Sequence, residues 1–100
     1  MKVLLINGSP HEKGCTYTAL EEIGKTLKEN NIESEIFQIG TRPLSSCLGC
    51  GRCSATGRCI LDDIVNKFLD KAAECDGFVF GAPVHFSSAN GAMISFMDRA

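Results

Sequence analysis

The feature that most constrains this fold is the alternation of short apolar runs with amphipathic helical stretches. The apolar runs do not alternate with polar residues, which is typical of strands buried on both faces of a parallel sheet. We expect strands at 2–7, 35–39 and 78–82 and helices at 16–29, 64–72 and 92–100. The side chains expected to face the core are Tyr17, Leu20, Ile23 and Leu27 in the first helix, Ile64, Val65, Phe68, Leu69 and Ala72 in the second, and Met93, Phe96 and Met97 in the third.

This order of elements predicts an α/β fold with a doubly wound parallel sheet, right-handed crossovers and helices on both faces. The expected strand order is 2-1-3, which leaves the third strand at an edge with unpaired backbone groups. Because that strand is the most apolar, we expect residues 1–100 to be the N-terminal part of a single domain whose later strands are missing from this chain. The alternative is a naturally short protein that pairs its edge strand in a dimer.

Composition and charge argue against several classes of protein. The net charge is −2 and the Lys and Arg residues are scattered, so the sequence has no basic footprint for a nucleic acid. No stretch approaches the roughly 20 apolar residues of a membrane span, and the first apolar run is too short for a signal peptide. We therefore expect a cytoplasmic protein. In a reducing compartment, its 6 cysteines indicate metal binding or redox chemistry more than disulfides.

The loop that leaves the first strand and enters the first helix, residues 8–18, is typical of an anion site. Free N–H groups and the dipole at a helix N-terminus favour negative charge, and Gly8 and Gly14 let the backbone approach a ligand closely. Four side chains add hydrogen-bond donors: Ser9, His11, Thr16 and Thr18. The loop matches neither the dinucleotide fingerprint nor the loop of nucleotide hydrolases, which favours a bound monophosphate over a transferred one. The alternative is a Ser/Thr-capped helix without a ligand.

A second loop, residues 83–91, follows the third strand. In such sheets, ligands bind at the carboxyl ends of the strands where the strand order reverses, here between the first and third strands. Pro83 fixes φ and cannot continue the sheet, so the chain should turn over this crevice and direct backbone N–H groups toward it. For His85 the alternative is an exposed loop histidine, and for Phe86 it is simple packing.

A compact group of cysteines consists of Cys47, Cys50, Cys53 and Cys59. Their spacing, C-x2-C-x2-C-x5-C, approaches the C-x2-C-x2-C-x3-C-P pattern of bacterial ferredoxins. Glycines between them permit a tight wrap, and Arg52 and Arg58 could balance anionic thiolates. A [4Fe–4S] cluster and free thiols both stay open, whereas zinc, which prefers two separated pairs of ligands, and a disulfide rank lower. Cys75 is expected to be a small core residue.

Several motifs in combination resemble a known family. Gly8-Ser9-Pro10 with Gly14-x-Thr16, then Ala82-Pro83-Val84-His85-Phe86 and Met97-Asp98-Arg99, are similar to those of NAD(P)H-dependent FMN reductases and iron–sulfur flavoproteins. The resemblance covers all 100 residues and implies a flavodoxin-like, FMN-binding fold. The flavin-binding residues that it implies are Ser9, His11, Cys15, Thr16, Tyr17 and Thr18 around the phosphate, and Pro83, Val84, His85, Phe86, Ser87, Asn90 and Gly91 around the ring. It also implies a [4Fe–4S] cluster on the four cysteines.

The function implied by this resemblance is that of an FMN-dependent oxidoreductase. NAD(P)H would reduce the flavin, which would pass electrons to a small molecule or a protein, and no residue of the chain is assigned a catalytic role. The alternative is an iron–sulfur flavoprotein that carries electrons for a ferredoxin-like partner, and a third is a regulatory fragment of a larger assembly. We expect a homodimer or higher oligomer. The Asp98-Arg99 pair is expected to be an ion contact on a helix surface.

Overall fold

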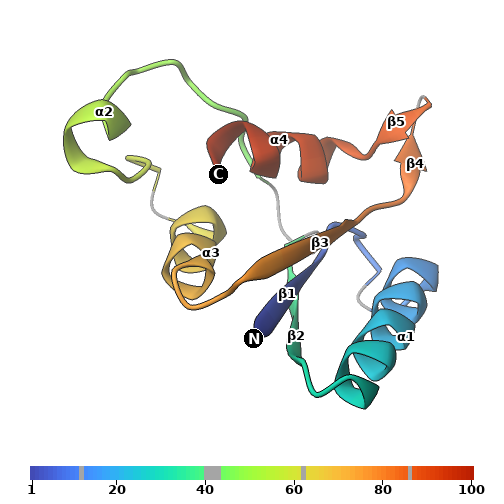
Figure 1. The fold of residues 1–100 in the computed structure, drawn as a ribbon. Helices are drawn as coiled ribbons and strands as arrows, with labels where there is room; N and C mark the ends of the chain where they lie inside the picture. Colours follow the sequence, from blue (N-terminus) through green and yellow to red (C-terminus); the bar gives the residue numbers. More distant parts are fainter. Residues whose placement is uncertain (12, 40–43, 62, 86) are drawn as a thin grey trace.

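The protein folds into a three-stranded parallel sheet with helices on both faces (Figure 1). The computed structural model describes residues 1–11, 13–39, 44–61, 63–85 and 87–100. The strands are β1 (Lys2–Asn7), β2 (Glu33–Gln38) and β3 (Gly77–Gly81), in the order β2-β1-β3. The helices are α1 (Cys15–Glu29), α2 (Cys53–Thr56), α3 (Ile64–Ala72) and α4 (Gly91–Arg99). The predicted α/β class and the strand order 2-1-3 are thus confirmed.

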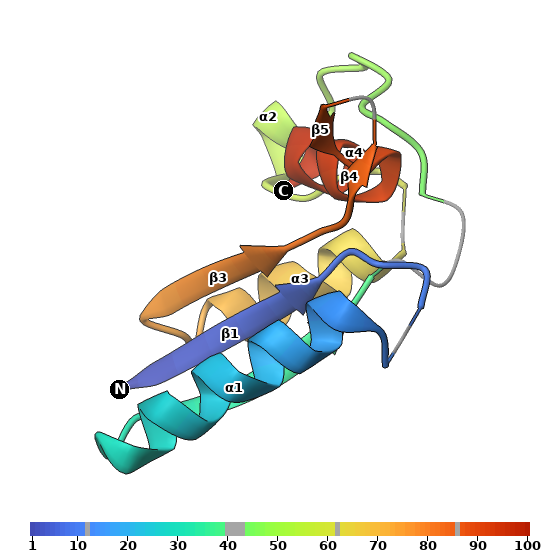
Figure 2. The same cartoon turned by 90° about the vertical axis from the view of Figure 1, so that its right-hand side faces the viewer.

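The central strand β1 carries the core because its side chains pack on both faces of the sheet. Leu4, Leu5 and Ile6 are fully buried, as expected of a strand with a neighbour on each side. Helix α1 covers one face, and α3 and α4 cover the other (Figures 1 and 2). The core on the second face consists of Leu4, Ile6, Phe37, Ile39, Val65, Phe68, Met93 and Phe96.

Local capping explains where the two helices on that face begin. The Asp63 carboxylate accepts a hydrogen bond of 3.1 Å from the Val65 N–H and caps α3. Its neighbour Asp62 lies outside the described residues. The Asn90 amide caps α4 in the same way. No helix in the described part of the chain is long and apolar enough to cross a membrane.

The expectation of a third strand buried on both faces is wrong. Phe78 is 41% exposed and Phe80 is 44% exposed, although Phe78 still contacts Phe68 with ring centroids 5.7 Å apart. Among the described strands, β3 pairs only with β1, so it lies at an edge where α3 and α4 do not cover its outer residues. Cys75, expected in the core, is half-buried and packs against it.

Three smaller predictions are also corrected. Ile23 is 37% exposed and Met97 is 54% exposed, because each lies beside, and not within, the stripe of its helix that faces the sheet. The second loop is not irregular throughout but contains a hairpin of β4 (Val84–His85) and β5 (Ser88–Ala89). Ser87 has a φ of 60° in this hairpin, as a tight two-residue turn requires.

Candidate functional site

The two predicted loops start side by side at the carboxyl ends of β1 and β3. The Gly8 N–H donates to the Gly81 carbonyl at 2.8 Å, so the two loops leave the sheet next to each other. From there one loop leads to α1 and the other leads through the β4–β5 hairpin to α4 (Figure 1). The position where the strand order reverses, at which a ligand crevice is expected, therefore lies between these two loops.

Glycine is required on both sides of this crevice because helices begin very close to the strand ends. A Cβ on Gly8 would lie 2.9 Å from Met93 Cε and 3.2 Å from Met93 Cβ in α4. A Cβ on Gly81 would lie 3.0 Å from Thr16 Cγ2 in α1. A side chain at either position would have to displace Met93 or Thr16, so the glycines favour the close approach of α1 and α4 to the strands.

Asn90 joins the two loops. Its Nδ2 donates to the Gly8 carbonyl at 2.6 Å, its Oδ1 accepts from the Met93 N–H at 3.3 Å, and its backbone N–H donates to the Pro83 carbonyl at 3.0 Å. The residue is buried. Both the amide nitrogen and the amide oxygen of Asn90 form hydrogen bonds within the protein, so the structure supports a positioning role for this residue. Direct contact with a flavin stays a prediction.

The first loop is also shaped from within by polar side chains. The Asn7 carboxamide oxygen accepts from the Ser9 N–H at 3.0 Å, and the Ser9 hydroxyl accepts from the His11 N–H at 3.1 Å. Gln38, at the end of β2, donates from Nε2 to the Ser9 carbonyl at 2.7 Å. Sequence reasoning missed Gln38 because its contact depends on strands that are neighbours only in space, and it missed Asn7 although that residue lies only two positions before Ser9. The Gln38 Oε1 is buried and has no partner among the described residues.

The N-terminus of α1 differs from those of α3 and α4. Its N-cap is Gly14, and no side chain in the described part of the chain caps it, whereas Asp63 and Asn90 cap the other two helices. N–H groups in an uncapped first turn need acceptors, and with the helix dipole they form an anion site. This arrangement fits a phosphate group.

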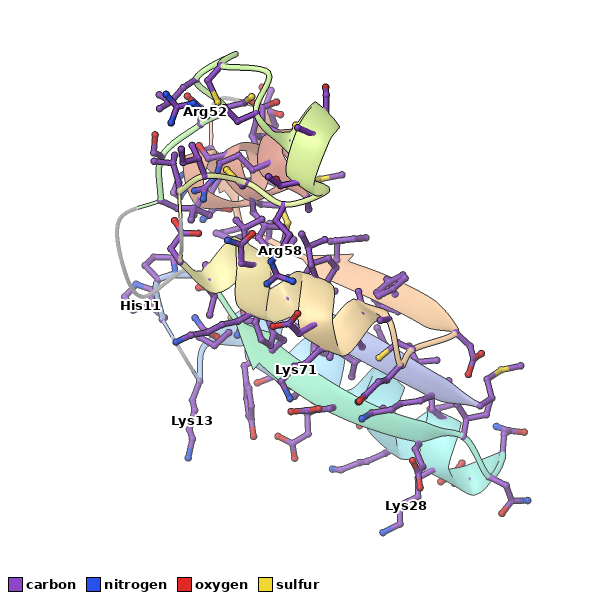
Figure 3. The ribbon with its side chains drawn as sticks, turned by 90° about the vertical axis from the view of Figure 1, so that its left-hand side faces the viewer. His11, Lys13, Lys28, Arg52, Arg58 and Lys71 are labelled. Carbon is purple, nitrogen blue, oxygen red and sulfur yellow. The ribbon has the colours of Figure 1, made fainter. Side chains whose placement is uncertain are left out.

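Two basic side chains lie next to this helix end. His11 and Lys13 both project from the segment that leads into α1 (Figure 3), and both are exposed. His11 was predicted from the sequence, whereas Lys13 was not, although its place in the loop offered the signal. Both would add positive charge or donors beside a bound anion.

The remaining predicted flavin contacts lie at the starts of α1 and α4 and on the second loop, and they are largely accessible. Cys15 is exposed, and the Thr18 hydroxyl donates a hydrogen bond of 3.2 Å to the Gly14 carbonyl. The other residues of this set that are at least partly exposed are Thr16, Tyr17, Pro83, Val84, His85, Ser87 and Gly91. Phe86 lies outside the described residues, so its predicted packing stays a prediction.

The four cysteines of the predicted cluster all line one cavity of about 90 Å³. They are free thiols, and no group of three His, Cys, Asp or Glu side chains in the described residues is arranged to hold a metal ion. Gly49, Gly51 and Gly57 have φ of 68°, 75° and 75°, which only glycine adopts readily, so the loop can turn between the cysteines. Thiols spread around a shared cavity fit a larger thiolate-bound group better than a single ion.

Arg99 is not the surface residue that the sequence suggested. Its side chain is 0% exposed, and its guanidinium pairs with both oxygens of Asp63, at 2.7 and 2.8 Å, instead of with Asp98. The expectation failed because Asp63 is remote in sequence and α4 packs Arg99 inward. Arg99 also lies beside Cys59, and its guanidinium, followed by the Leu61 backbone, lowers the pKa of the Cys59 thiol.

Comparison with known proteins agrees with this geometry. Residues 1–100 match the family described as NADPH-dependent FMN reductase. The chain belongs to the NADPH-dependent FMN reductase family. As a member of this family, with parallel strands in the order 2-1-3, it has a flavodoxin-like fold.

The curated relatives of this family member are named iron-sulfur flavoproteins. One from Methanocaldococcus jannaschii is 35% identical over 100 residues, which are 100% of this chain and 52% of the relative. One from Archaeoglobus fulgidus is also 35% identical, covering 100% of this chain and 49% of the relative. A relative from Clostridioides difficile is 33% identical, covering 100% of this chain and 46% of the relative. The chain thus spans about half the length of these proteins.

Among solved structures, a flavone reductase matches this family member with a TM-score of 0.75 and 26% sequence identity. The match covers 98% of this chain and 29% of that chain. The shared region therefore includes both loops of the crevice and the cysteine loop.

The Asp63–Arg99 pair should make the stability of this family member depend on acid pH. Burial raises the pKa of the Asp63 carboxyl, but hydrogen bonds from Arg99 and the Val65 N–H outweigh it, so the pKa lies below its ordinary value. A carboxyl with a depressed folded-state pKa stabilises the protein above its unfolded pKa of about 4, and this contribution is lost as pH falls from there through the folded value. Denaturant titration of the metal-free protein should show that loss.

The variant Asp63→Asn isolates this effect because asparagine still caps α3 but does not titrate. The stability difference between wild type and Asp63→Asn should be constant above about pH 5 and shrink below about pH 4. Asp70→Asn is the matched control, since Asp70 pairs with Arg58 on the surface and such pairs contribute little. A difference that stays the same down to pH 3 would show that the Asp63 pair is not formed in solution.

Proposed function

We propose that this chain binds FMN in the crevice between β1 and β3 and acts as a flavin-dependent oxidoreductase. The observation that carries this proposal is the uncapped N-terminus of α1 facing a second loop that Asn90 ties to Gly8. The phosphate would bind the first turn of α1 with Ser9 and Thr16. The ring would lie against the β4–β5 hairpin and the segment that begins at Pro83.

The chemistry belongs to the cofactor, and the residues of the chain bind and orient it. FMN, when bound, accepts hydride from NAD(P)H and passes electrons to a small-molecule or protein acceptor. Backbone N–H groups after Pro83 would donate to the ring, and the glycines at positions 8 and 81 let α1 and α4 begin close to the strand ends beside it. No acid–base residue of this chain is required for that role. The electron donor and acceptor are part of the proposal.

A second candidate is specifically favoured by the cysteine cavity. Cys47, Cys50, Cys53 and Cys59 line one space, and the curated relatives are named iron-sulfur flavoproteins. We propose that these thiolates hold a [4Fe–4S] cluster, which would supply single-electron transfer to a ferredoxin-like partner. Iron and sulfide analysis after anaerobic purification tests this candidate. A cluster without NAD(P)H oxidation would favour the electron carrier over the reductase.

Removing hydroxyls from the phosphate loop is expected to weaken FMN binding. Thr16→Val keeps the shape of the side chain, and Ser9→Ala also leaves the His11 N–H without its acceptor. A hydrogen bond to a charged group contributes roughly 1.5–3 kcal/mol, so each variant should raise the Kd for FMN roughly 10- to 100-fold. Quenching of FMN fluorescence on titration with protein measures this Kd.

The matched control is Thr26→Val, in the same helix but far from the loop. The Thr26 hydroxyl donates to the Glu22 carbonyl, at 3.2 Å, on the exposed face of α1. The Kd of Thr26→Val for FMN should equal that of the wild type. If Ser9→Ala and Thr16→Val bind FMN as tightly as Thr26→Val, the phosphate does not lie at this helix end.

A further inference from the structure

Arg99 is the most deeply buried charged side chain near the cysteine loop among the described residues, and a two-point ion pair anchors it. Its terminal nitrogens donate to Asp63 Oδ1 at 2.7 Å and to Asp63 Oδ2 at 2.8 Å. This parallel geometry uses the planar fork of the guanidinium, which lysine cannot reproduce. The orientation of the Arg99 head group is therefore fixed by α3, since Asp63 also caps that helix.

The same guanidinium holds both ends of the cysteine loop. One terminal nitrogen donates to the Ser45 carbonyl at 3.2 Å, and the other donates to the Leu61 carbonyl at 2.9 Å. Ser45 precedes Cys47 by two positions, and Leu61 follows Cys59 by two. One side chain thus closes a loop that has little regular structure apart from the four-residue helix α2.

One donor of Arg99 is left over. Its Nε is buried and has no hydrogen-bond partner in the part of the chain that the structure describes. Arg99 lines the cavity shared by Cys47, Cys50, Cys53 and Cys59. A buried donor without an acceptor is costly, and the costs are larger for a charged group. A sulfur atom in this cavity would supply the missing acceptor.

The other two arginines near the cysteines, Arg52 and Arg58, do not line the cysteine cavity. The sequence suggested these two residues as the balancing charges. Arg58 is held against α3 by Asp70 at 2.8 Å and by the Asn66 carbonyl at 3.2 Å. Arg52 is exposed on the loop, away from the sheet (Figure 3).

We propose that Arg99 is a positioning residue for the thiolate-bound group: it clasps the two ends of the cysteine loop and donates its Nε–H to a sulfur in the cavity. The proposal rests on the proposed [4Fe–4S] site. Because a hydrogen bond to a cluster sulfur stabilises the more negative, reduced form, this contact would raise the reduction potential. Asn90 and Arg99 lie at opposite ends of α4, so one helix would position both candidate sites (Figure 1).

The test compares Arg99→Lys, which keeps the charge but loses the fork, with Arg52→Gln, which removes a charge from the loop without touching the cavity. Amide hydrogen exchange of the metal-free protein tests whether Arg99 holds the two ends of the cysteine loop together. Exchange in residues 44–61 should accelerate roughly tenfold or more in Arg99→Lys and stay at the wild-type rate in Arg52→Gln. Asp63→Asn, which keeps the α3 cap, gives a second variant with an intermediate effect if Arg99→Lys fails to fold.

The midpoint potential of the reconstituted protein tests the hydrogen bond from Arg99 to sulfur. After anaerobic loading with iron and sulfide, the midpoint potential of Arg99→Lys should be more negative than that of the wild type, and that of Arg52→Gln should change less. Unchanged exchange and an unchanged potential in Arg99→Lys would overturn the proposal. If the wild type takes up no iron and sulfide, the cluster and its hydrogen bond are both wrong, whereas the exchange rates still decide whether Arg99 clasps the loop.

Discussion

Replacing Phe96 by alanine is expected to lower the free energy of unfolding by roughly 3–5 kcal/mol. Phe96 is 0% exposed and its ring meets Phe68 edge to face, with centroids 4.8 Å apart. The loss combines the transfer of a large apolar side chain with the cavity left between α3, α4 and the sheet. Since α4 carries Asn90 and Arg99, loosening it should weaken both candidate sites. Urea titration followed by far-UV circular dichroism measures the change.

Met97→Ala is the matched control for Phe96→Ala, because Met97 is the next residue of the same helix. It is 54% exposed, so its replacement should change stability by less than about 1 kcal/mol. Equal losses for the two variants would mean that α4 does not present its Phe96 face to the core in solution.

Asn90→Ala is expected to cost roughly 2–4 kcal/mol and to weaken FMN binding. The variant removes the cap of α4, which contributes about 0.5–2 kcal/mol, and leaves the buried Gly8 carbonyl without a donor, which costs about 1–3 kcal/mol. It also removes the side-chain tie between the phosphate loop and the second loop. The unfolding free energy and the Kd for FMN should therefore change together.

Two further variants separate the parts of this effect. Asn90→Asp keeps the oxygen that accepts from Met93 but loses the donor to Gly8, so it should retain the helix cap and still weaken FMN binding. Asn30→Ala removes an exposed amide hydrogen bond of 2.8 Å to the Thr26 carbonyl and should leave both quantities close to the wild type. If Asn90→Ala behaved like Asn30→Ala, the link between the loops would not matter for the site.

Much of the fold could be predicted because it depends on local periodicity. The first strand was predicted with the observed bounds, and α1 and α4 begin within one residue of their predicted starts. The order of strands and helices then restricts the topology, since parallel strands need right-handed crossovers. The crevice between β1 and β3 follows from that topology, which is why both loops could be placed on it before any contact was known.

Side chains at an edge could not be predicted in the same way. Phe78 and Phe80 have the composition of a buried strand, yet they are half-exposed because β3 has only β1 beside it among the described strands. Met97 was assigned to the core because of its apolar character, although Phe96 occupies that side of the helix. Burial depends on which element lies opposite, and a local pattern does not contain that information.

The sequence by itself determined the order of the elements, the polar loop at the start of α1 and the group of four cysteines. Only the tertiary structure decided how these parts are joined. Asn90 reaches Gly8 across 82 positions, and Arg99 reaches Asp63 across 36. Such contacts form between residues that packing brings together, so spacing along the chain cannot reveal them. Through these contacts, the loop of the first candidate site is held at the N-terminal end of α4, and the cysteine loop is held at its C-terminal end.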